Sequence, residues 1–234
     1  DLNTHYKKFF VPENMVLCIS GNFKKDMVSR YVNEIFGNLQ GKFFGQKPPL
    51  KTTQTEPRYL FKKSPSQTIG FKLCHKAYPY KHEKVIIMLL LADVLGGGIS
   101  SRLSLTVREK LGLVYDITCY PTMFSDVGSI DIYTSTKKAN FEKTTKAVID
   151  EVHKFFHEGI TEQELNRTEE RVFSQTQLAM DSPLAMANWF GVEELLVSPK
   201  MPDTPEKQAQ KIHNIKLAEV HNAISEIFVP EKRN

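Results

Sequence analysis

An arginine and a tyrosine follow a run of glycines, and both side chains can donate hydrogen bonds to a carbonyl or carboxylate oxygen. The run Gly96–Gly98 ends an apolar segment, and the serines Ser100 and Ser101 come directly after it. The next segment carries Arg108 and, beyond a further glycine, Tyr115. Because glycine lets another chain approach the backbone closely, this block indicates a surface that holds a peptide.

The same block also has a purely structural interpretation. Glycines can end a helix, a serine can cap the next one, and a single arginine can lie on its surface. On residue chemistry alone, this second interpretation is favoured. Phosphate binding at Gly96–Gly98 is a weaker hypothesis. The segment lacks the Gly-x-x-x-x-Gly-Lys-Ser/Thr pattern, and its glycines follow a helix-like run rather than a strand.

Three longer motifs carry a family resemblance: LGGGISSRL with VREKLGLVY, HYKKFFVPENMVLCISGNF near the start, and GITEQELNRTEERVFSQ later. They resemble the C-terminal, non-zinc-binding domain of the M16 (pitrilysin-type) zinc metallopeptidases, such as bacterial and mitochondrial processing peptidases. The resemblance covers nearly the whole chain. It implies that Arg108 and Tyr115 bind the substrate backbone and stabilise the oxyanion formed on hydrolysis. It also implies that the loop residues bind substrate, namely Gly96, Gly97, Gly98, Ser100 and Ser101.

The zinc motif of that family, His-x-x-Glu-His, does not occur in this sequence. In the family a zinc-bound water is the nucleophile, and the glutamate of the motif is the base. The nearest pattern is His153–His157, where phenylalanine replaces the glutamate. Lys146 and Asp150 share the helix face of these histidines, so we interpret that face as solvated. We expect no metal and no other cofactor in this chain, and the resemblance implies zinc in the other domain of the parent enzyme.

Two functions remain open. The first is a substrate-holding, non-catalytic C-terminal domain of an M16-type zinc metalloendopeptidase, inactive on its own. The alternative is a catalytically inactive scaffold subunit, like the core proteins of the same family. Retention of both Arg108 and Tyr115 favours the first. The expected partners are a zinc-binding M16 domain or subunit and a peptide substrate, and exchange of the leading strand would give a homodimer.

Composition is that of an ordinary soluble globular protein, with 234 residues, 41% of them hydrophobic and 25% charged. The net charge of +4 is small and the lysines are scattered, so we expect no nucleic-acid binding. No segment approaches the roughly 18–20 apolar residues that span a membrane, and the compartment stays open between cytoplasm and periplasm. Cys18, Cys74 and Cys119 lie in apolar runs, which predicts buried free thiols.

Patterning predicts an α+β fold with a mostly antiparallel β-sheet packed against several α-helices. Tyr115 falls in a predicted strand, where it would be half-buried. The expected strands are 14–20, 58–63, 67–75, 114–120 and 128–136. The expected helices are 26–39, 83–95, 101–110, 138–157, 162–180, 183–196, a short one from 204, and 216–228.

Domain organisation follows from the family resemblance. Residues 1–45 are expected to be the closing strand–helix unit of a preceding M16 domain, and the Pro-containing segment 46–57 a linker. Residues 58–234 would then be an M16 C-terminal domain that lacks its last strand. An unpaired strand edge invites pairing. The leading strand is therefore expected to fill that position, in its own chain or, by swapping, in a symmetric dimer.

Overall fold

The computed structural model describes residues 1–45, 50, 54–197 and 204–234. The chain divides into two compact units. One comprises Asp1–Pro49 and Thr176–Glu206, and the other comprises Leu50–Gln175 and Lys207–Asn234. The predicted linker at 46–57 lies mostly outside the described residues.

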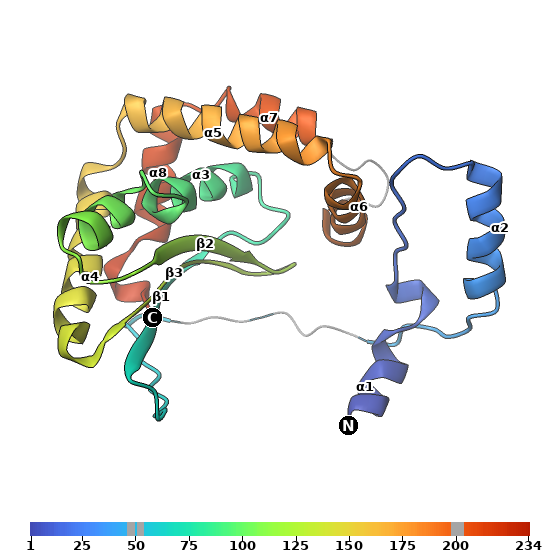
Figure 1. The fold of residues 1–234 in the computed structure, drawn as a ribbon, viewed down its shortest axis with the longest axis horizontal. Helices are drawn as coiled ribbons and strands as arrows, with labels where there is room; N and C mark the ends of the chain where they lie inside the picture. The colour runs from blue at the N-terminus through green and yellow to red at the C-terminus, as the bar shows by residue number, and fades with distance from the viewer. Residues whose placement is uncertain (46–49, 51–53, 198–203) are drawn as a thin grey trace. The chain divides into compact units, whose positions relative to one another are not determined.

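The second unit is built on a three-stranded antiparallel sheet with the order β1-β3-β2 (Figure 1). The strands are β1 (Thr68–Ala77), β2 (Ile117–Met123) and β3 (Gly128–Lys137). Central β3 places Asp131 opposite both Cys74 and Tyr120. Pro121 lies within β2, which is possible because an edge strand has one side free of ladder hydrogen bonds. The predicted α+β class and antiparallel sheet are confirmed.

Helices cover one face of this sheet (Figure 1). They are α3 (Val85–Gly96), α4 (Phe141–Glu158) and α8 (Leu217–Ile227). Strand alternation turns Leu73, Ile130 and Ile132 toward these helices, and all three are buried. Burying one such side chain contributes about 1.5–3 kcal/mol, so this helix–sheet layer is the main core. The helix expected at 83–95 is confirmed as α3, and most of its residues are buried.

The start of α5 (Glu162–Met180) is fixed by a capping box between Thr161 and Glu164. The Thr161 hydroxyl accepts the Glu164 N–H at 3.2 Å, and the Glu164 carboxylate accepts the Thr161 N–H at 2.8 Å. Arg102 donates two hydrogen bonds to the same carboxylate, from Nε at 2.6 Å and from Nη2 at 2.8 Å. Its Nη2 also donates to the Gly159 carbonyl at 2.8 Å. We call this pair the Arg102–Glu164 clasp.

Residues of the first unit bury little apolar surface against one another. Its helices are α1 (Leu2–Phe9), α2 (Lys25–Phe36) and α6 (Pro183–Val192), and η4 (Glu193–Val197) continues α6 as a π-helix. Although α2 is amphipathic, none of its residues is buried. Met27, Tyr31 and Ile35 are 43, 51 and 67% exposed. This apolar face of α2 therefore has no cover within the described part of the chain.

Two predicted strands are wrong. Segment 14–20 forms no sheet with any described residue, although Met15 has extended dihedrals of φ −127° and ψ 142°. An extended segment becomes a stable strand only beside others. Segment 58–63 is not a strand either, and the Arg58 N–H instead donates to the Arg233 carbonyl at 3.3 Å. Beside it, Asn234 and Cys74 exchange backbone hydrogen bonds of 2.7 and 2.8 Å at the edge of β1.

The histidines and cysteines only partly follow expectation. His157 is exposed and Lys146 pairs with Asp150 at 2.7 Å, as a solvated face requires. His153, however, is half-buried with its Nε2 3.0 Å from Arg233 Nη1, because the chain end covers it. The three cysteines are free, but only Cys119 is buried, while Cys18 and Cys74 are partly exposed.

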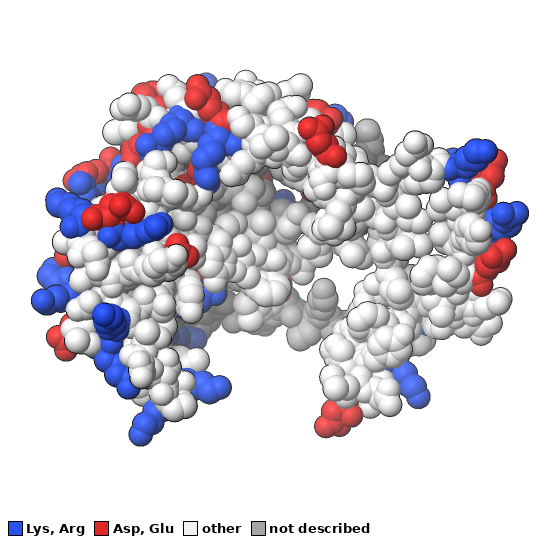
Figure 2. All heavy atoms as spheres, in the orientation of Figure 1, with Lys and Arg blue, Asp and Glu red and all other residues white. Residues whose placement is uncertain are grey.

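On the face shown in Figure 2, basic and acidic side chains are interspersed over the sheet-bearing unit. No helix in the described ranges is both long enough and apolar enough to cross a membrane.

Candidate functional site

The segment that carries Arg108 is a π-helix, η2 (Ser104–Lys110). A helix was predicted here, but its hydrogen bonding is wider than in an α-helix. The Leu111 N–H, for example, donates to the Thr106 carbonyl at 3.2 Å, an i→i+5 bond. Val107 is buried, whereas Leu111, at the end of the segment, is 47% exposed. Gly112, at φ 61°, ends the segment in the left-handed region.

Arg108 and Tyr115 lie together at the surface. The Arg108 guanidinium carbon is 5.9 Å from the centroid of the Tyr115 ring. Tyr115 is 90% exposed and precedes β2, which begins only at Ile117. The interpretation of Tyr115 as a half-buried strand residue is therefore wrong. Arg108 Nε is 3.4 Å from a Glu109 carboxylate oxygen, a surface ion pair that contributes little energy.

The core holds the arginine's segment in place. Leu103 and Val107 are fully buried, and the Thr106 hydroxyl donates to Glu151 of α4 at 3.1 Å. Arg108 thus projects from an anchored helix, while Tyr115 stands on the turn that follows. The pair presents a guanidinium and a phenol hydroxyl at one exposed place. Both groups can donate to a carbonyl oxygen or to the oxyanion that develops from it.

The glycine loop is shaped by close packing on both sides. A Cβ on Gly96 would lie 2.5 Å from the Cys119 backbone nitrogen, so glycine is needed where α3 meets β2. A Cβ on Gly97 would lie 2.6 Å from Nη2 of Arg171, which reaches the loop from α5. Sequence analysis missed Arg171, because only the fold brings α5 to this loop.

The predicted substrate-binding residues of the glycine loop differ in how far they are exposed to solvent. Gly98 and Ser100 are exposed and Gly97 is half-buried, whereas Gly96 and Ser101 are buried. Gly98 and Ser100 are thus open to a ligand at the surface. The substrate-binding role of this loop stays a prediction, as do the roles of Arg108 and Tyr115.

Metal-binding residues do not gather in the described ranges. No group of three or more His, Cys, Asp or Glu side chains is placed there to hold a metal ion. His153 and His157 thus have no third ligand among these residues.

The structure therefore defines an α+β domain that presents an arginine–tyrosine pair at its surface. The chain belongs to the M16 peptidase family: the family model for the peptidase M16 inactive domain matches residues 1–172. The resemblance seen in the sequence motifs is thereby confirmed.

Relatives of this chain are zinc proteases that are themselves described as uncharacterized. YmxG of Bacillus subtilis is 24% identical over 98% of this chain and 55% of its own length. An uncharacterized zinc protease of Rickettsia felis is 28% identical over 94% of this chain and 52% of its own length. The chain thus spans about half the length of the relatives it matches.

Solved structures share the fold. A protease from Helicobacter pylori superposes with a TM-score of 0.77 at 17% identity, covering 92% of this chain and 52% of that protein. A peptidase M16 inactive domain from Pseudomonas fluorescens superposes with a TM-score of 0.76 at 19% identity, covering 91% and 50%.

Proposed function

We propose that this chain is the substrate-holding, non-catalytic C-terminal domain of an M16-type zinc metalloendopeptidase. The observation that carries the proposal is the exposed Arg108–Tyr115 pair on an anchored segment of a domain of this family. The names of the relatives and the half-length match support a parent protein with a separate zinc-binding half. That half would be the partner of this domain, on the same chain or on another.

In this proposal the two side chains act on the peptide and not on the metal. Zinc in the other half would activate the attacking water. Arg108 would donate to the carbonyl oxygen of the scissile bond and hold it as negative charge develops. Tyr115 would donate a second hydrogen bond and orient the peptide backbone. Donors fixed in advance at such an oxygen are worth roughly 10²–10³-fold in rate each.

The test is peptide hydrolysis by the parent protein with its zinc-binding half present. Arg108→Ala should lower kcat/KM by roughly 10²-fold, mainly through kcat, and Tyr115→Phe by a smaller factor. Lys110→Ala is the matched control, because Lys110 is an exposed cation of the same π-helix. It should leave hydrolysis nearly unchanged.

Unchanged kcat/KM in Arg108→Ala would refute the assigned role. A parent protein that binds its partner but hydrolyses no peptide would instead identify this chain as a scaffold subunit.

A further inference from the structure

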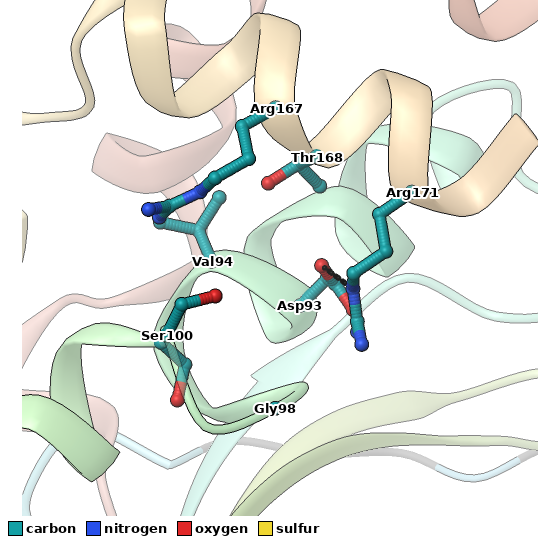
Figure 3. Close-up of a pocket in the computed structure, with 8 residues that line it drawn as sticks. Asp93, Val94, Gly98, Ser100, Arg167, Thr168 and Arg171 are labelled. Carbon is teal, nitrogen blue, oxygen red and sulfur yellow. Dashed lines mark hydrogen bonds and ion pairs between the residues drawn. The ribbon is translucent and has the colours of Figure 1, made fainter. Parts of the chain in front are cut away.

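A small pocket lies in the second unit between α5 and the loop that follows α3 (Figure 3). Its volume is about 20 Å³, which holds about one water-sized group. Polar side chains and one glycine form most of its wall. They are Asp93, Gly98, Ser100, Ser101, Arg167, Thr168 and Arg171. Arg108 and Tyr115 are not part of this wall.

The pocket carries one unpaired positive charge. Arg171 is ion-paired with Asp93, with Nε 3.0 Å from Oδ2 and a second close contact between Nη2 and Oδ1. The two charges of this pair compensate each other. Arg167 lies one helical turn earlier on the same face of α5. Its side chain extends toward Val94 and Ser100, away from Arg171 (Figure 3). It makes no ion pair or hydrogen bond with any residue in the described ranges.

A buried serine lines the same space. Ser101 is only 4% exposed and lines the pocket, and its hydroxyl has no hydrogen-bond partner in the described part of the chain. A buried hydroxyl without a partner costs free energy, which an incoming acceptor would recover. The unpaired guanidinium and the unpartnered hydroxyl are both donors. A negatively charged acceptor would therefore satisfy both groups at once.

We propose that this pocket binds a carboxylate group. One oxygen would enter the pocket and accept from the Ser101 hydroxyl, while the carboxylate also accepts from the Arg167 guanidinium, whose planar fork matches it. A phosphate fits less well, since the space admits about one oxygen-sized group. The carboxylate comes from a small free acid or from the C-terminus of a peptide.

The test is a titration of the full ¹⁵N-labelled chain followed by NMR. The probes are acetate, N-acetyl-dialanine, the amide of the same dipeptide, and inorganic phosphate. Acetate and the free-acid dipeptide should shift the Gly98 and Ser100 amide signals to saturation, and the dipeptide amide should not. Tighter binding of the dipeptide than of acetate identifies a peptide C-terminus, and equal binding identifies an isolated carboxylate.

Variants then assign the donors. Arg167→Gln should weaken acetate binding by about tenfold or more, because it removes a charge-assisted hydrogen bond. Ser101→Ala should weaken it several-fold without lowering Tm, since the lost hydroxyl has no partner among the described residues. Arg30→Gln, a change of an exposed arginine on α2, is the matched control and should bind as wild type.

Three results would overturn the proposal: unchanged acetate binding in Arg167→Gln, equal binding of the dipeptide amide, or tighter binding of phosphate than of either carboxylate. Arg167 is exposed, so its replacement leaves the fold intact and this test holds even if Ser101→Ala misfolds.

Discussion

Replacing Arg102 by methionine should destabilise the second unit strongly. Methionine keeps an apolar side chain over the Phe155 ring, which the Arg102 guanidinium covers at 5.2 Å, but it removes the hydrogen bonds to Glu164 and Gly159. The two partners of the clasp are only 15 and 17% exposed. Loss of Arg102 would therefore leave the Glu164 carboxylate charged and largely buried without its cation.

The magnitude follows from the pKa of Glu164. Burial raises this pKa, but the hydrogen bonds from Arg102 and Thr161 outweigh burial and bring it from 4.5 to about 2. Such a drop corresponds to roughly 3 kcal/mol of stability at neutral pH. Removing one partner of a buried ion pair typically lowers the free energy of unfolding of a protein by about 3–5 kcal/mol, which agrees with this figure. We therefore expect Arg102→Met to lower the free energy of unfolding by about 3 kcal/mol.

The sign of the pH dependence gives a second test of the clasp. The folded pKa of Glu164 lies below its unfolded value, so its contribution is complete above pH 4.5 and is lost as the pH falls toward 2. Urea unfolding by circular dichroism at pH 7 and at low pH should show this loss in wild type. The loss should be smaller in Glu164→Gln. A double-mutant cycle of Arg102→Met with Glu164→Gln should show strong coupling.

A cost of Arg102→Met below about 1 kcal/mol at pH 7, or the same cost at pH 7 and pH 2, would refute this reasoning.

Three further outcomes are expected from urea unfolding. Gly96→Ala should cost more than about 2 kcal/mol, because its Cβ would meet the Cys119 backbone, whereas Gly98→Ala meets only the flexible end of an arginine. Equal effects would contradict this. Thr161→Ala should cost about 1 kcal/mol through loss of the cap, and Thr161→Ser should restore it. Burial lowers the pKa of His75 from 6.5 to about 4. The folded protein therefore resists protonation of His75, and the free energy of unfolding should decrease by roughly 3 kcal/mol as the pH falls from 6.5 to 4. His75→Leu should remove this slope.

Local patterns of the sequence predicted much of the sheet-bearing unit. An apolar run such as Val85–Gly96 has few alternatives to a buried helix, and α3 is one. The spacing of Thr161 and Glu164 predicts a capping box from four consecutive residues, and that cap is formed. The Arg108–Tyr115 pair was found through family motifs, since its residue chemistry alone favoured a structural role.

Features that depend on distant partners could not be predicted. The segment 14–20 has the composition of a strand, but a strand exists only where another one pairs with it. The pocket between Arg167 and Ser101 joins residues of α5 to the glycine loop, and no spacing in the sequence links them. The π-helix was also missed, because its residues satisfy the apolar pattern of an α-helix equally well.

The π-helix of Ser104–Lys110 has an evolutionary consequence. Its hydrogen bonds span one residue more than those of an α-helix. Deleting a single residue within it would let the remaining residues form the α-helical ladder, which needs one residue fewer for each hydrogen-bonded turn. The later side chains would then keep nearly the same angular positions around the axis, and Arg108 would stay on the side of Tyr115. Descendants that keep this pair should therefore tolerate the loss of one residue from this segment, whereas the loss of two residues should be rare.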